Sequence, residues 1–180
     1  QDPDPRVNGN GLAQIAKEGI IVCLGVEAAL ASEALKYFIH KIQNGKPYCS
    51  LKIAASIDGR IALSDRKKRW LTGPEMRRYV HLLRSQADAI ITGIGTVLAD
   101  DPQLNCRNEG LENDSPPIFI FDRLLRIPAT AEILQSPYPV TLFCGEAAPE
   151  QRRQALGDVG CVTVPLPDDT DGQPDIGAAL

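Results

Sequence analysis

The sequence predicts an α/β fold with a mostly parallel sheet and flanking helices. Three observations support this. Its apolar runs are short and end in turn residues, they alternate with helical segments, and 43% hydrophobic with 23% charged residues is ordinary for a globular chain of 180 residues. The strands expected in the second half are 89–92, 118–121, 140–144 and 161–164, with a helix at 149–156 between the last two. Strands that alternate with helices favour a parallel sheet covered on both faces.

The first 47 residues predict two helices around one strand. Leu12, Ile15 and Ala16 give a helical rhythm over 10–19, and Gly19 is a C-terminal stop. Residues 20–26 form an apolar run typical of a buried strand, and 27–43 an amphipathic helix. Asn44-Gly45-Lys46-Pro47 ends that helix and behaves as a linker. We therefore expect a domain boundary near residue 45, which divides 1–45 from 46–180.

The segment LKIAASIDGRIA, residues 51–62, combines an apolar strand with charge. A strand is expected over 48–55, with Lys52 inside it, followed by a turn at Asp58-Gly59. Asp-Gly is a strong β-hairpin signal. The same residues are also typical of a ligand site, in which the strand carries a cation that faces the ligand and the turn opens a loop over the site. The two interpretations stay open on this segment alone.

A helix is expected over 73–86. Thr72-Gly73-Pro74-Glu75 has the pattern of a capping box, and a proline near a helix start strengthens it. Met76, Val80 and Leu83 follow at helical spacing and predict the buried face.

Charge and composition exclude several classes of protein. A net charge of −4 does not favour a nucleic-acid surface, and the basic run Arg66-Lys67-Lys68-Arg69 is typical of a solvated loop. The chain lacks the roughly 18 consecutive apolar residues that span a bilayer. The five cysteines form no CxxC pair, and four of them lie in apolar surroundings typical of strands, which indicates small reduced core residues and a cytoplasmic protein. Two histidines, His40 and His81, give no metal-ligand set.

Candidate binding residues cluster after the strand at 89–92. Gly93-Ile94-Gly95-Thr96 lets a backbone approach an anion such as a pyrophosphate, although Leu98 breaks the full dinucleotide pattern. A tight turn without ligand has the same sequence. Asp100-Asp101-Pro102 is either a helix-ending turn or, with Arg107, a hydroxyl and phosphate site.

For two further side chains, a structural and a ligand-binding interpretation are both open. Arg84, on the helix at 73–86, is either a surface residue or a phosphate clamp. Trp70 is either a core residue or a flat surface against a ligand. The residues present assemble no nucleophile with its base, so no catalytic residue is assigned.

Several motifs then occur in order at the spacing of one family: LKIAASIDGRIA, W-L-T-G-P-E-x-R, V-H-x-L-R, A-D-A-I-x-x-G-x-G-T-V-L-A-D-D-P-x-L and a closing Cys-Arg107. They resemble the reductase domain of the bifunctional riboflavin-biosynthesis deaminase/reductase, which has a dihydrofolate-reductase-like fold. Residues 1–45 are similar to the end of that family's cytidine-deaminase-like α/β domain. The likeness covers most of residues 2–123.

The resemblance implies a site for NADPH and for a phosphorylated ribosylamino-pyrimidine. It places NADPH near Ala54, Trp70, Thr96 and Asp100, and the substrate near Lys52, Arg84, Leu104 and Arg107. The implied reaction reduces the ribosyl chain of 5-amino-6-(5-phosphoribosylamino)uracil to the ribityl form. Possible partners in the family are further copies of the chain, as a homodimer or higher assembly, with neither nucleic acid nor membrane.

The departures from the family pattern define the alternatives. The family's zinc motif lies upstream of residue 1, so zinc is expected only there, and its Glu-Gly-Gly segment belongs beyond residue 180. Lys68 and Arg123 replace smaller residues that commonly contact cofactor. A stand-alone dihydrofolate-reductase-like enzyme on another pyrimidine or pterin, or an inactive nucleotide-binding piece, are the competing hypotheses.

Overall fold

The computed structural model describes residues 2–62 and 70–180. The predicted solvated run Arg66–Arg69, with Lys68, lies outside the described residues. The chain divides into two compact units, one up to Lys52 and one from Ile53 to Ala179. The boundary expected near residue 45 falls in the same stretch and stays a prediction.

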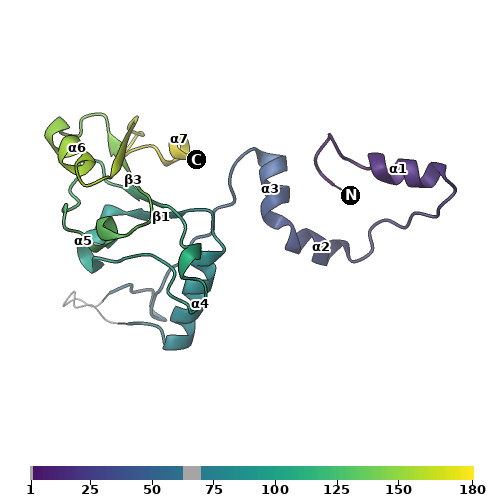
Figure 1. The fold of residues 1–180 in the computed structure, drawn as a ribbon, viewed down its shortest axis with the longest axis horizontal. Helices are drawn as coiled ribbons and strands as arrows, with labels where there is room; N and C mark the ends of the chain where they lie inside the picture. Colours follow the sequence, from purple (N-terminus) through teal and green to yellow (C-terminus); the bar gives the residue numbers. More distant parts are fainter. Residues whose placement is uncertain (1, 63–69) are drawn as a thin grey trace. The chain divides into compact units, whose positions relative to one another are not determined.

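The first unit contains three helices, which are coloured purple to blue in Figure 1. They are α1 (Asn10–Lys17), α2 (Ala28–Ala34) and α3 (Lys36–Asn44). The helix predicted over 27–43 is thus broken at Leu35, whose φ of −107° and ψ of 14° depart from helical values. Gly45 ends α3 in the left-handed conformation with φ 68°, as the Asn-Gly-Lys-Pro sequence predicts.

Two predicted strands, 20–26 and 48–55, are wrong. Both segments lack regular secondary structure, and Ile21 and Leu51 are 95% and 86% exposed. A strand needs a neighbouring strand for its N–H and C=O groups. The strands among the described residues all lie between Ile90 and Leu166 and pair with one another. Cys23 and Cys49 are consequently exposed, whereas Cys106, Cys144 and Cys161 are buried.

The turn predicted at Asp58-Gly59 is present. The Ser56 N–H donates to the Arg60 carbonyl at 2.9 Å, the Ser56 hydroxyl donates to Asp58 Oδ1 at 2.5 Å, and Gly59 has φ 76°. No strand flanks this turn in the described residues, so the hairpin interpretation does not hold.

The second unit is built on a four-stranded sheet in the order β1-β2-β3-β4, with every neighbouring pair parallel. Its strands are β1 (Ile90–Gly93), β2 (Ile118–Phe121), β3 (Val140–Gly145) and β4 (Val162–Leu166). Ile90 pairs with Ile118, and Ile118 with Val140. The four strands predicted from the second half of the sequence and their parallel pairing are confirmed.

One face of this sheet carries the core. The helices α5 (Ile94–Asp100) and α6 (Glu150–Gly157) and the 3₁₀ turn η2 (Glu132–Gln135) supply Ile94, Val97, Ile133 and Leu156, which pack with the inward residues of β2 and β3. The same face receives each element because successive right-handed crossovers between adjacent strands fall on one side. Figure 1 shows α5 and α6 beside the strands.

The opposite face of the sheet is less covered than predicted. Phe119, Phe121 and Phe143 are half-buried there, and the Phe119 and Phe143 rings stack with centroids 5.6 Å apart. Ile91 and Val162, on the same face, are 46% and 56% exposed. In the described residues, helices therefore cover one face of the sheet far better than the other.

Helix α4 (Pro74–Ser85) confirms the helix predicted over 73–86 but not its details. Its N-cap is Gly73, one residue after Thr72, and no side chain makes a capping bond, so the predicted capping box is wrong. Pro74 occupies the first helical position, where its missing N–H costs nothing. Met76 and Leu83 are exposed and Val80 is half-buried, while His81 and Arg84 face a loop. The predicted apolar stripe is therefore not the packed face.

Two short elements complete the unit, the 3₁₀ turn η1 (Glu112–Asp114) and α7 (Ile176–Ala179). Among the described residues, no helix combines the length and the apolar character that crossing a membrane requires.

Candidate anion-binding site between helix α4 and the loop after α5

The candidate site is formed by α4 and the loop 101–108. This loop begins where α5 ends, at Asp101, which has φ 40° and ψ 61°. Pro102 disfavours the right-handed helical conformation at the preceding residue, and aspartate tolerates the left-handed region better than most side chains. The Asp-Asp-Pro sequence therefore ends the helix, as its simpler interpretation predicts.

Leu104 has an unusual backbone in the middle of this loop. Its φ is 54°, in a region where non-glycine residues are uncommon and a branched side chain costs of order 1 kcal/mol or more. Its side chain is half-buried against the core. Such a conformation persists only where neighbouring contacts hold it, and these contacts come from both sides of the loop.

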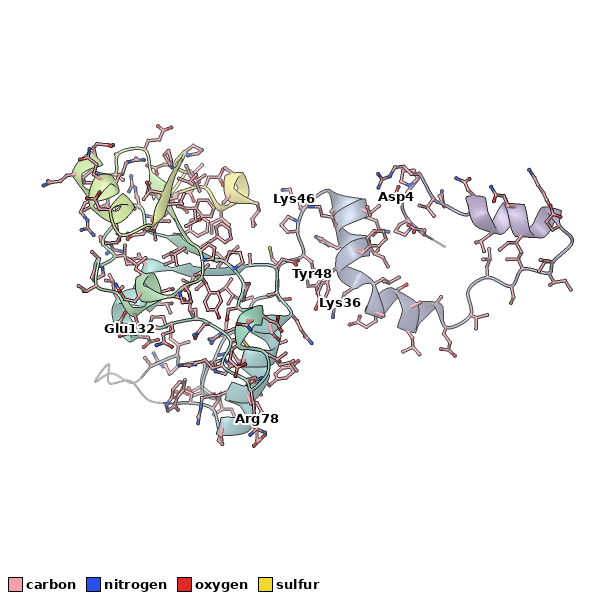
Figure 2. All side chains as sticks on the ribbon, viewed as in Figure 1. Asp4, Lys36, Lys46, Tyr48, Arg78 and Glu132 are labelled. Atoms are coloured by element: carbon pink, nitrogen blue, oxygen red, sulfur yellow. The ribbon has the colours of Figure 1, made fainter. Side chains whose placement is uncertain are left out.

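On one side, the loop is bonded to α4. The Arg84 guanidinium donates from Nη1 to the Asn105 carbonyl at 2.9 Å, and the Cys106 thiol lies 3.2 Å from the His81 carbonyl. The Asn108 amide donates to the Arg78 carbonyl at 3.1 Å; Arg78 is labelled on α4 in Figure 2. These bonds fix residues 105–108 along the helix.

On the other side, the loop is bonded to η2. The Gln103 amide donates to Glu132 Oε2 at 3.3 Å, and the Glu132 N–H donates to Asp101 Oδ1 at 2.9 Å; Glu132 is labelled in Figure 2. Arg107 Nη1 reaches Gln103 Oε1 at 3.4 Å. The chain from Arg107 through Gln103 to Glu132 holds the guanidinium over the loop.

A polar cavity of about 160 Å³ opens beside the loop, lined by Gln103, Asn105, Glu132, Gln135, Ser136 and Pro137. The Asn105 Oδ1 atom is buried and has no hydrogen-bond partner among the described residues. A buried acceptor without a partner is costly, so a ligand N–H or O–H at this point would be stabilised.

Two cations, Arg84 and Arg107, lie near each other, while the Glu132 carboxylate lines the cavity. None of the ion pairs between described residues involves Arg84 or Arg107. Burial, and after it the nearby Arg107 charge, lower the pKa of the Arg84 guanidinium. Two neighbouring guanidinium groups with no ion-pair partner among residues 2–62 and 70–180 suit an anion, and a phosphate above all, because each guanidinium can donate two parallel bonds to it.

His81 lies close enough to both cations for their charges to act on its ring. The Arg107 backbone N–H is 3.2 Å from His81 Nδ1, and the Asn105 carbonyl is also 3.2 Å from that atom. Burial first, and then the charges of Arg84 and Arg107, lower the pKa of His81 from its ordinary value. The imidazole is therefore neutral at physiological pH.

The residues predicted for the cofactor lie on three segments. Thr96 and Asp100 are four residues apart on α5 and both exposed, opposite the buried Ile94 and Val97. Ala54 is half-buried in the irregular segment before the Ser56 turn. Trp70 is 76% exposed, and the Arg77 guanidinium lies 4.7 Å from its ring centroid. Its exposure excludes the core interpretation of Trp70, and its contact with a ligand stays a prediction.

The substrate residues are partly assembled. Arg84, Leu104 and Arg107 lie together in the second unit, whereas Lys52 belongs to the first unit. The structure therefore groups three of the four predicted substrate residues and groups Thr96 with Asp100. The individual ligand assignments stay predictions.

Two residues of the site were missed from the sequence. The sequence excludes His81 as a metal ligand and places it in the V-H-x-L-R motif but predicts no binding role for it, although it precedes Arg84 by three positions and so shares its helix face. Asn105 contributes mainly its backbone carbonyl, for which the side-chain identity gives no signal.

The fold and this site define an α/β domain with a parallel sheet, in which Arg84 on α4 and Arg107 on the following loop lie near each other. Comparison with known proteins identifies its family. The sequence profile of the RibD C-terminal domain matches residues 47–171, and the chain belongs to that family.

Individual relatives agree with this assignment. The chain is 36% identical over 148 residues to the riboflavin biosynthesis protein RibD of Escherichia coli K12, covering 76% of this chain and 40% of that protein. With RibD of Bacillus amyloliquefaciens the identity is 33% over 161 residues, covering 89% of this chain and 43% of the relative. The chain thus spans less than half the length of these relatives.

Solved structures give the same result. A structure of Acinetobacter baumannii RibD superposes with a TM-score of 0.75 at 34% identity, covering 99% of this chain and 49% of that one. A diaminohydroxyphosphoribosylaminopyrimidine deaminase/5-amino-6-(5-phosphoribosylamino)uracil reductase from Thermotoga maritima superposes with a TM-score of 0.72 at 29% identity, covering 91% and 51% of the two chains. The reductase-like α/β fold predicted from the sequence is confirmed.

Proposed function

We propose that this chain provides the reductase activity of a riboflavin-biosynthesis protein. The reaction is the NADPH-dependent reduction of 5-amino-6-(5-phosphoribosylamino)uracil, whose ribosyl group becomes a ribityl chain. Family membership and the name of the Thermotoga maritima protein support the reaction class. The observation that carries the proposal is the cluster of Arg84 and Arg107, which suits the phosphate of this substrate.

In this proposal the loop 101–108 recognises the substrate. Arg84, held by the Asn105 carbonyl, and Arg107, held by Gln103, bind the phosphate from two elements. The buried Asn105 Oδ1 atom accepts from a donor of the substrate. Lys52 and Leu104 complete the proposed substrate set, with Leu104 providing a fixed apolar contact.

The backbone at the junction of β1 and α5 supports the proposed NADPH site. A Cβ atom built at Gly93 or Gly95 would meet nothing within 4 Å, so the backbone at the β1–α5 junction faces open space. Thr96 and Asp100 extend that open surface along α5, and Trp70 and Ala54 are assigned to the same ligand. When bound, NADPH supplies the hydride for ribose C1 of the open-chain imine. The chain's own contribution is to bind and orient the two reactants, which such a transfer chiefly requires.

A zinc-dependent pyrimidine deaminase activity is proposed only for the full-length protein. The residues described here do not fit a zinc site, because residues 2–62 and 70–180 contain no group of three His, Cys, Asp or Glu side chains able to hold a metal. A cytoplasmic setting is also part of the proposal, supported by five free cysteines, three of them buried.

The test uses the full-length protein with the phosphoribosylamino-pyrimidine and either NADPH or NADH. We expect nicotinamide oxidation with NADPH, a lower rate with NADH, and a product two hydrogen atoms heavier by mass spectrometry. The dephosphorylated substrate is the matched control, and it should bind much less tightly. Failure to oxidise either nucleotide would contradict the proposal and favour the inactive nucleotide-binding alternative.

A further inference from the structure

The contact between His81 and Arg107 has a chemical consequence for the loop. A backbone N–H can only donate, so the contact of the Arg107 N–H at 3.2 Å is a hydrogen bond only where His81 Nδ1 accepts. Nδ1 is then unprotonated and the proton of the neutral ring is on Nε2. In this tautomer the Asn105 carbonyl, also 3.2 Å from Nδ1, receives no bond from the imidazole and is served by Arg84 Nη1 at 2.9 Å.

The opposite tautomer would rearrange these bonds. With a proton on Nδ1, the ring would donate to the Asn105 carbonyl, in competition with Arg84, and the Arg107 N–H would lose its acceptor. The two tautomers therefore differ in the backbone group to which His81 bonds: the Arg107 N–H in one and the Asn105 carbonyl in the other. The charged groups that act on the ring are Arg84 from its own helix and Arg107 from the loop, and both disfavour the protonated form.

We propose that neutral His81, protonated on Nε2, is a positioning residue that fixes the Arg107 backbone so that Arg107 and Arg84 bind one substrate phosphate together. This inference rests on the proposed function for the identity of the anion. It assigns to His81 no contact with the substrate and no proton transfer. His81 acts by positioning the Arg107 side chain. Arg107 belongs to the loop whose backbone has a positive φ at Leu104.

Substitutions of His81 distinguish the role of Nδ1 from that of Nε2. His81→Asn places a carbonyl oxygen near the position of Nδ1 and can accept from the Arg107 N–H. His81→Gln places its polar group near the position of Nε2 and cannot. We expect His81→Ala and His81→Gln to raise the KM for the substrate about tenfold, the effect of losing one hydrogen bond, with kcat and the KM for NADPH nearly unchanged. His81→Asn should restore the KM to within about threefold of the original protein.

The pH dependence gives a second readout. As the pH falls through the lowered pKa of His81, the original protein should lose the Arg107 bond while His81→Asn keeps it. The substrate KM of the original protein divided by that of His81→Asn should therefore rise toward acid pH. The titration of the substrate phosphate affects both KM values equally and cancels in this ratio. The control is His40→Asn, on α3 of the first unit, which should match the original protein at every pH.

The tautomer itself is measured without substrate by nitrogen NMR of histidine-labelled full-length protein. The imidazole signals that disappear in His81→Asn should show a protonated Nε2 and an unprotonated Nδ1 at neutral pH. A proton on Nδ1, equal KM values for His81→Asn and His81→Gln, or a KM ratio independent of pH would each overturn the inference. Absence of activity in the original protein would instead contradict the proposed function, and the tautomer measurement would still decide the role of His81.

Discussion

Arg84 and Asn105 are joined by a 2.9 Å hydrogen bond from the guanidinium Nη1 to the backbone carbonyl oxygen. The bond crosses from α4 to a loop 21 residues further along the chain. It occupies one of the five N–H donors of the guanidinium. Arg84 is therefore oriented by the protein backbone, and we infer that other donors of the same group bind the substrate phosphate.

Replacing Arg84 by alanine should weaken substrate binding selectively. Loss of a charge-assisted hydrogen bond costs about 1.5–3 kcal/mol, which corresponds to about a ten- to hundredfold rise in the substrate KM. The KM for NADPH should change little. Arg84→Lys should recover only part of the affinity, because an ammonium group cannot reproduce two parallel bonds. Steady-state kinetics of the full-length protein with each ligand varied in turn measures both constants.

Arg78→Ala is the matched control for this prediction. Arg78 lies on the same helix with a side chain 72% exposed, and it pairs with Glu75 at 3.6 Å. The control should leave both KM values unchanged. An Arg84→Ala protein with weaker NADPH binding and normal substrate binding would reverse the assignment of the two ligands.

The neighbouring carboxylates Asp100 and Asp101 should respond differently to substitution. Asp101 accepts the Glu132 N–H and has φ 40°, so Asp101→Ala should lower the free energy of unfolding by about 1–3 kcal/mol. Asp101→Asn, which tolerates this φ and keeps a carbonyl oxygen, should lose less than about 1 kcal/mol. Asp100→Asn should instead raise the KM for NADPH. Denaturation and kinetics together test the pair, and a stability loss confined to Asp100→Asn would refute it.

Leu142 should contribute strongly to stability. It is fully buried in the middle of β3, so Leu142→Ala should cost about 2–5 kcal/mol. Ile91→Ala, on the other face and 46% exposed, should cost below about 1 kcal/mol. Hydrogen exchange of peptides from β2 and β3 in the full-length protein reports the difference. Similar losses of protection in both variants would show that the two faces are buried alike.

The cysteines should fall into two reactivity classes. Burial raises the pKa of the Cys161 thiol to about 11 and raises that of Cys144 as well. Because the thiolate is the reactive form, these thiols should resist alkylation at pH 8, when Cys23 and Cys49 react. Peptide mapping after timed treatment with iodoacetamide distinguishes them. Rapid labelling of Cys161 in the folded protein would contradict its burial.

The sheet could be predicted from the sequence because each of its strands has a recognisable local sequence pattern. Ile118–Phe121 and Val140–Gly145 are short, apolar, β-branched or aromatic, and bounded by turn residues. The same local signal is present at 20–26 and 48–55, where no strand forms. Local apolar character cannot say whether a partner strand is adjacent, and pairing decides the outcome.

The candidate site was predictable in its charges but not in its bonds. Arg84 and Arg107 could be nominated from their residue types and spacing. The backbone acceptor at Asn105, the left-handed Leu104 and the acceptor nitrogen of His81 depend on how the loop returns to α4. Such contacts join residues more than twenty positions apart, and no periodicity encodes them. The capping box failed for a related reason, because a helix start shifted by one residue leaves Thr72 outside the cap.

The order β1-β2-β3-β4 also has a kinetic consequence. Among the described strands, each pairs with the strand that follows it along the chain, so none of these pairings waits for a distant segment. Parallel sheets fold slowly chiefly because long loops must close before their contacts form. Here a growing sheet closes one crossover at a time, and each crossover delivers the helix or turn that covers the newly formed ladder. The four strands can therefore pair one after another, from β1 to β4, as the chain emerges during synthesis.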